Sequence, residues 1–95
     1  MSKRVFTSIR TETKINRTLH NVTQVTISNY SKNDPCFIVL NGIVRELPPM
    51  YIIGFTSMPY TWSISDVEPF DFSFEINFGT SSGIAVIDYI EQPKC

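Results

Sequence analysis

The stretch FDFSFEINF, residues 70–78, alternates large apolar and polar side chains without interruption. A period of two places one set of side chains on each face of a β-strand. One face is wholly apolar and the other polar: Phe70, Phe72, Phe74, Ile76 and Phe78 against Asp71, Ser73, Glu75 and Asn77. Burying each large apolar side chain stabilises a fold by about 1.5–3 kcal/mol. The stretch therefore predicts a strand whose apolar face packs against a second layer of sheet.

A β-hairpin is predicted upstream, in FIVLNGIVRELPP, residues 37–49. Two apolar runs flank Asn41 and Gly42, and both of these residues tolerate the positive φ that a type I′ turn requires. Pro48 and Pro49 have no backbone N–H to give to a sheet, so they end the second strand.

The remaining chain also has the character of short strands. We expect strands at residues 22–30, 50–55, 61–65 and 84–91, an acidic turn at 66–70, and a five-residue hairpin loop at 79–83. Val25 and Ile27 form the inward face of the first, and Gly54 marks a bulge in the second. No segment keeps a helical period over ten residues. The sequence thus predicts an all-β fold: a small antiparallel β-sandwich or open barrel of six to seven strands.

Charge divides the chain in two. Residues 1–20 hold five basic residues and one acidic residue, whereas residues 21–95 hold three basic and eight acidic residues. Four threonines and little Leu, Ala or Glu disfavour a helix in the first part. We predict an extended basic N-terminal arm (1–20) before a β-sandwich domain (21–95). The 75 residues of this domain are slightly too few for a full eight-stranded jelly roll. The expected partner-binding residues of the arm are Lys3, Arg4, Val5, Phe6, Ile9, Arg10, Lys14 and Arg17.

The sequence argues against catalysis. Nucleophilic hydrolysis needs a nucleophile, a base and an orienting group, yet the single histidine, His20, lies in the basic arm. The carboxylates at 66, 68, 71 and 75 have the spacing of solvated strand and turn positions rather than that of a glycosidase pair or a calcium loop. Cys36 and Cys95 have no metal or redox spacing. We therefore expect a non-enzymatic protein with no cofactor and no metal.

Two binding functions remain as alternatives. Tyr51, Tyr60 and Trp62 flank Pro59 in a connecting region, where exposed aromatic rings could stack on sugars. Against this, Trp62 alternates with Ile64, which favours a core position. The basic arm could also neutralise nucleic-acid phosphates, but the acidic body disfavours nucleic acid as a partner.

The stretch QVTISNYSKNDPCFIVLNGIVRELPP, residues 24–49, combines a strand, a polar turn and an apolar strand that reaches Asn-Gly and a proline-limited end. In this it resembles small all-β accessory proteins of tailed-phage virions, such as head decoration proteins, head fibres and adaptors. The resemblance implies a structural virion subunit that attaches through a terminal arm and forms homo-oligomers, with a trimer favoured, alongside other virion proteins. It also implies assembly in the host cytoplasm.

Two further expectations concern targeting. No apolar segment follows the first charged residues, so we expect no signal peptide. The apolar run at 50–55 is far too short to span a bilayer, so we expect no membrane partner.

Overall fold

The computed structural model describes residues 4–92, and all the regular structure in this range is β-strand. The eight strands are β1 (Val5–Thr11), β2 (Ile15–Asn29), β3 (Cys36–Leu40), β4 (Ile43–Leu47), β5 (Tyr51–Ile53), β6 (Thr56–Met58), β7 (Tyr60–Asn77) and β8 (Ala85–Glu91). Six of them form one antiparallel sheet in the order β1-β8-β2-β7-β3-β4, and β5 pairs with β6. The prediction of an all-β antiparallel fold is confirmed; the strand count is eight rather than six or seven.

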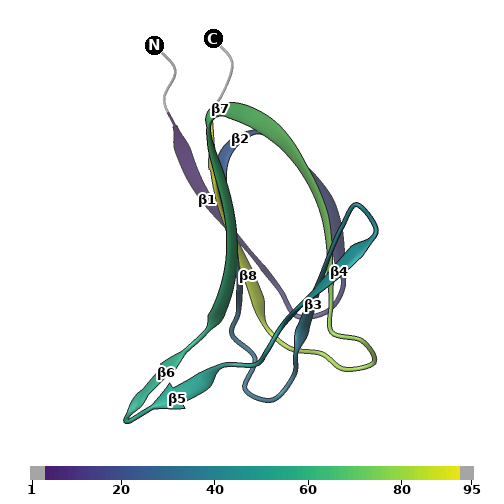
Figure 1. The fold of residues 1–95 in the computed structure, drawn as a ribbon, viewed down its shortest axis with the longest axis vertical. Coiled ribbons are helices and arrows are strands. Elements are labelled where there is room, and N and C mark those ends of the chain that lie inside the picture. The colour runs from purple at the N-terminus through teal and green to yellow at the C-terminus, as the bar shows by residue number, and fades with distance from the viewer. Residues whose placement is uncertain (1–3, 93–95) are drawn as a thin grey trace.

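The two longest strands, β2 and β7, pair with each other and bend together into an arch (Figure 1). Residues 24–29 of β2 pair with residues 60–65 of β7 on one limb, and residues 15–19 pair with 72–76 on the other. The first limb continues into β8 and β1, and the second into β3 and β4. One sheet thus rolls over on itself to give two facing layers.

The bend has identifiable local causes. The register of β2 against β7 shifts between Leu19 and Val22 and again before Gln24, and such irregularities sharpen the bend and twist of a strand pair. Asn21, with φ of 55°, takes the left-handed conformation that asparagine tolerates. Its N–H donates to Oδ1 of Asp71 at 3.2 Å, and its carbonyl accepts from the N–H of Gln92 at 2.8 Å.

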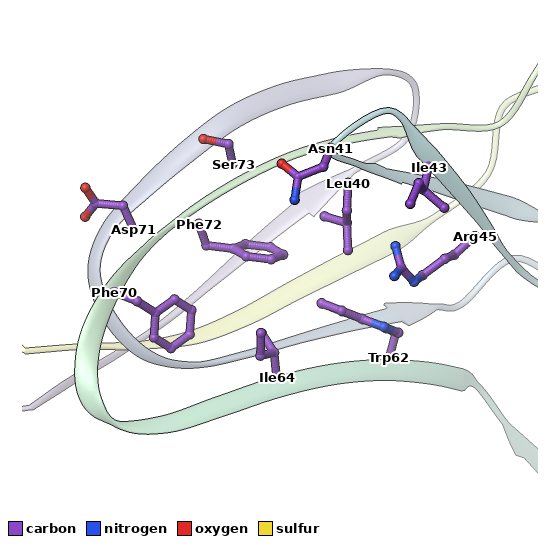
Figure 2. Close-up of a pocket in the computed structure, with 10 residues that line it drawn as sticks. All are labelled: Leu40, Asn41, Ile43, Arg45, Trp62, Ile64, Phe70, Asp71, Phe72 and Ser73. Atoms are coloured by element: carbon purple, nitrogen blue, oxygen red, sulfur yellow. The ribbon is translucent and has the colours of Figure 1, made fainter.

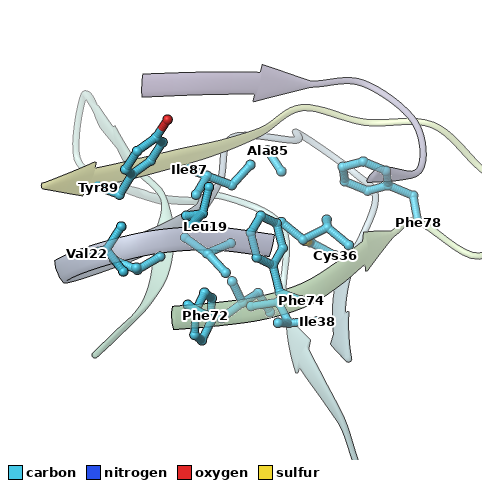
Figure 3. Packing of buried hydrophobic residues seen from close by; sticks show 14 residues of the cluster. Leu19, Val22, Cys36, Ile38, Phe72, Phe74, Phe78, Ala85, Ile87 and Tyr89 are labelled. Atoms are coloured by element: carbon cyan, nitrogen blue, oxygen red, sulfur yellow. The ribbon is translucent and has the colours of Figure 1, made fainter. Parts of the chain in front are cut away.

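The core lies between the two layers (Figure 3). One layer supplies Val25, Ile27 and Ile87, each with no exposed surface, and the other supplies Ile38 and Ile76, which are equally buried. The predicted apolar face of residues 70–78 is confirmed, since its four members from Phe72 to Phe78 are buried and Phe70 packs at the edge of the cluster. This face packs against the opposite layer of the sheet, as the alternating stretch predicted.

The predicted arm is the main correction. Of its described part, residues 5–11 form β1, which pairs with β8 along its whole length, and residues 15–20 begin β2. Ile9 packs against the core, which holds this strand to the sheet. The predicted arm therefore adds strands to the sheet of its own chain, and it supplies the residues that an eight-stranded fold needs. Lys3 lies outside the described residues.

Two predicted turns are also wrong. The acidic segment 66–70 is the corner of the continuous strand β7, rather than a turn between two strands. The loop 79–83 does not join hairpin partners, because β8 pairs with β1 and β2 in the opposite layer from the end of β7. This loop crosses between the layers, and there the N–H of Gly83 donates to the carbonyl of Glu12 at 3.1 Å.

The β3–β4 hairpin is confirmed. Asn41 has φ of 52° and Gly42 has φ of 79°, as a type I′ turn requires. The predicted strand at 50–55 and the connection after it instead form the β5–β6 hairpin. Gly54, with φ of 61°, and Phe55 make its two-residue turn, so Gly54 serves a reversal and not a bulge.

Candidate functional site

A pocket of about 420 Å³ opens inside the arch, between the two limbs of β7 and the β3–β4 hairpin. Figure 2 shows Trp62 and Ile64 entering it from one limb, and Phe70 and Phe72 from the other. The hairpin closes the third side with Leu40, Asn41, Ile43 and Arg45. Pockets of this volume with apolar and aromatic walls are typical of binding sites at the mouths of β-barrels.

Arg45 is the charged side chain that points into the pocket. Asp71 and Ser73 also border the pocket, but their side chains point away from it in Figure 2. The Ser73 hydroxyl instead lies 2.9 Å from the hydroxyl of Thr18 on the outer face. Arg45 points inward, and within residues 4–92 its guanidinium forms no ion pair with a carboxylate. The pocket therefore presents aromatic walls and a guanidinium free to meet an incoming group.

The three aromatic residues predicted as a surface site do not form one platform. Tyr51 and Tyr60 lie together, with ring centroids 4.8 Å apart and planes tilted by 54°. Trp62 is half-buried and stacks on Phe72 at 5.7 Å, across the two layers. The core interpretation of Trp62 is thus close to the structure, although its ring also faces the pocket.

The β5–β6 hairpin is the most exposed apolar feature. It extends from the base of the molecule, away from the arch (Figure 1). Ile52 has a relative exposure of 74% and Phe55, in its turn, of 110%. The sequence has no charged residue between Glu46 and Asp66, a span that includes the whole hairpin. Uncharged surface rich in aromatic residues and methionine is characteristic of the centre of a protein–protein interface.

The basic residues predicted as an arm site, so far as the structure describes them, are spread along β1, β2 and the residues next to these strands. Arg10 pairs with Glu12 at 3.2 Å, and Lys14 pairs with Glu75 at 3.6 Å. The apolar residues expected to dock, Val5 and Phe6, are exposed on β1, at one edge of the main sheet. Arg4 and Arg17 are exposed as well. The structure therefore leaves an edge strand where the sequence predicted an arm.

The titratable groups form no reactive cluster in the described part of the chain. Nδ1 of His20 lies 3.4 Å from Oδ1 of Asp71, and both side chains are about two-thirds exposed at 68% and 65%. Residues 4–92 contain no group of three His, Cys, Asp or Glu side chains placed to hold a metal ion. Burial raises the pKa of the Cys36 thiol to about 12, which makes it unreactive at neutral pH. Cys95 lies outside the described residues.

Comparison with known proteins defines the fold. No protein-family model and no curated protein matches the chain. The chain is similar to a de novo designed double-stranded β-helix solved by NMR, with a TM-score of 0.50 and 11% identity over 94% of this chain and 99% of the other. It is also similar to a conserved protein of unknown function from Pseudomonas aeruginosa PAO1, with a TM-score of 0.55 and 7% identity. That match covers 98% of this chain but 42% of the other. At these identities the likeness concerns the fold alone, and a rolled double-stranded β-helix describes the arch well.

The described residues contain no helix long and apolar enough to cross a lipid bilayer.

Sequence reasoning missed the exposed β5–β6 hairpin and the pocket. A signal for the hairpin was present, because the charge-free span of the sequence coincides with it. The pocket had no such signal, since its walls meet only after β7 bends.

Proposed function

We propose that this protein is a non-enzymatic structural subunit that works by binding other protein chains, and that it forms homo-oligomers, with a trimer favoured. The exposed, uncharged β5–β6 hairpin carries this proposal. Large exposed apolar patches on a soluble protein commonly mark sites that bind other proteins. The virion of a tailed phage is the setting that we propose, on the resemblance of residues 24–49 to virion accessory proteins.

The edges of the main sheet support the same function. β1 and β4 are its outer strands, and among residues 4–92 each has one side without a neighbour in the sheet. Both carry exposed apolar residues: Val5 and Phe6 on β1, and Ile43 and Val44 on β4. An open edge offers unpaired N–H and C=O groups to a strand of another chain. In this proposal attachment uses the hairpin and the edge strands, in place of the N-terminal arm first expected.

The alternatives of glycan and nucleic-acid binding have less support. The Tyr51–Tyr60 pair is a small aromatic surface, and its rings are tilted rather than coplanar, so it offers no flat platform for a sugar ring. Arg10 and Lys14, two of the five basic residues assigned to the arm, are engaged with carboxylates. Phosphate binding would have to compete with these pairs.

The mass of the protein in solution tests the proposal. Sedimentation equilibrium of the full chain from about 1 µM to about 1 mM should show reversible, concentration-dependent association. Replacing two exposed hairpin residues, Ile52→Ser with Met58→Ser, should weaken it. Val67→Ser is the matched control, because Val67 is 85% exposed at the β7 corner, away from the hairpin. A chain that stays monomeric over the whole range contradicts the homo-oligomer.

A further inference from the structure

We propose that copies of this chain join head to tail, with Phe55 of one copy inserted into the arch pocket of the next. This inference rests on the proposed homo-oligomer and names the contact that builds it. The two surfaces involved are the turn of the β5–β6 hairpin and the pocket lined by Trp62, Ile64, Phe70 and Arg45.

The two surfaces match in chemistry. Phe55 has a relative exposure of 110%, so its ring makes almost no contact within its own chain. The pocket walls are aromatic and aliphatic, and aromatic pairs favour tilted or offset contacts of the kind that Trp62 and Phe72 already make. Arg45 points into the pocket with no carboxylate partner within the described chain, and a guanidinium is attracted to the face of an aromatic ring.

They also match in size and surroundings. A volume of about 420 Å³ holds one aromatic side chain with the backbone of the turn that carries it. Exposed apolar residues stand at the rim, Ile43 at 60% and Ile64 at 40% exposure. The hairpin that would lie across this rim has no charged side chain, so docking would leave no hairpin charge buried without a partner.

The contact must form between copies. Figure 1 shows the hairpin extending away from the arch, and no hairpin residue lines the pocket of its own chain. Because the hairpin turn with Phe55 (the knob) and the arch pocket (the hole) are different surfaces of the chain, the interface is heterologous. Repeated contacts of this type close into a ring if the rotation permits, and three copies would give the trimer that we favour; otherwise they give a filament.

Two single substitutions separate the knob from the hole. Phe55→Lys removes the ring and places a cation opposite Arg45, and Ile64→Lys adds a cation to the pocket wall at a partly exposed position. Val67→Lys makes the same chemical change on an exposed side chain outside both surfaces. Circular dichroism of each variant checks that the fold is intact.

Sedimentation equilibrium of each variant alone and of a mixture gives the test. We expect Phe55→Lys and Ile64→Lys each to weaken self-association by about 30-fold or more, the size of a hot-spot loss, and Val67→Lys to leave it unchanged. An equimolar mixture of the first two should form a 1:1 dimer and nothing larger, because one intact knob meets one intact hole.

Trp62 provides a direct reading of the pocket, since it is the single tryptophan of the chain and lines the hole. In the mixture, adding Trp62→Phe to the Ile64→Lys chain leaves the only tryptophan in the intact hole, where docking should shift its emission to shorter wavelength. Assembly that persists in Phe55→Lys overturns this contact and leaves the homo-oligomer standing. A mixture that stays monomeric while both variants have lost assembly also overturns it. A parent chain that never associates overturns both proposals.

Discussion

Replacing Asn29 with aspartate should remove a large part of the stability of this fold. The Asn29 side chain has no exposed surface and lies at the end of β2. Its Nδ2 group donates to the carbonyls of Asp34 (3.1 Å), Leu47 (3.0 Å) and Pro48 (3.1 Å), and its Oδ1 accepts from the N–H of Ser31 at 2.9 Å. One amide thus joins the end of β2 to the start and the end of the β3–β4 hairpin.

Asn29→Asp keeps the shape of the side chain and removes both donor hydrogens. Each lost hydrogen bond costs about 1 kcal/mol, and a buried carboxylate that faces carbonyl oxygens without a cation adds several more. We expect a loss of about 3–5 kcal/mol at pH 7, against a total of about 5–14 kcal/mol for a chain of this length. With a slope of about 3 kcal/mol per molar, the guanidinium chloride midpoint should fall by roughly 1–1.7 M.

The loss should depend on pH in a known direction. Burial raises the pKa of the introduced carboxyl group in the folded state above its unfolded value of about 3.9. A raised folded pKa makes the variant most stable, relative to the parent, at low pH, and this gain is lost as the pH rises through the folded pKa. The free energies of unfolding of variant and parent should therefore differ less at pH 4.5 than at pH 7.

The control is Asn33→Asp, at an exposed asparagine in the loop that follows β2. It should change the free energy of unfolding by less than about 0.5 kcal/mol. A loss below about 1 kcal/mol at pH 7 for Asn29→Asp, or an equal loss at both pH values, would refute this reasoning.

Two further predictions concern other buried groups. Gly83→Ala should destabilise the fold by about 3 kcal/mol in the same denaturation assay, because the new Cβ would meet the Ser31 hydroxyl and lie 2.8 Å from the Phe78 ring. The control Gly42→Ala has open space around it and should cost only about 1 kcal/mol, because of the positive φ of Gly42. Equal losses in the two variants would contradict the steric account. Burial raises the pKa of the Cys36 thiol to about 12. In a Cys95→Ser variant, Cys36 should therefore react with Ellman's reagent at pH 8 on the order of 100-fold more slowly in the folded chain than in the unfolded chain. Comparable rates would mean that the thiol is accessible in the folded chain.

The elements that the sequence predicted well are those fixed by neighbours in the chain. The alternation from Phe70 to Phe78 predicts a strand, because only a strand places every second residue on the same side. Asn41 and Gly42 likewise specify their turn through their own backbone preferences, and their φ values confirm it. In both cases the cause and the effect lie within a few residues, so no knowledge of the rest of the fold was needed.

The elements that the sequence predicted poorly depend on distant partners. β1 is an edge strand in which Ile9 is the residue that reaches the core, so its pattern is too weak to separate a strand from an arm. The polar start of β2 lacks a pattern for a related reason, since its side chains at 16–18 are exposed. The crossing of loop 79–83 is a property of topology, because a short loop between strands is compatible with either layer as the destination.

The corner of β7 explains why the pocket could be found only in the structure. Asp66 and Pro69 are turn formers, and their presence predicts a break between two strands. The strand instead bends there without a break. Four residues, an even number, separate Ser65 from Phe70, so the alternation of inward and outward side chains continues unchanged from one limb to the other. Even-numbered side chains therefore point into the arch from both limbs, Trp62 and Ile64 on one side and Phe70 and Phe72 on the other. An odd number of residues at the corner would turn one wall outward, since a shift of one residue exchanges the faces of a strand. The length of the corner thus determines both that the two layers share a core and that a hole with aromatic walls remains at its mouth.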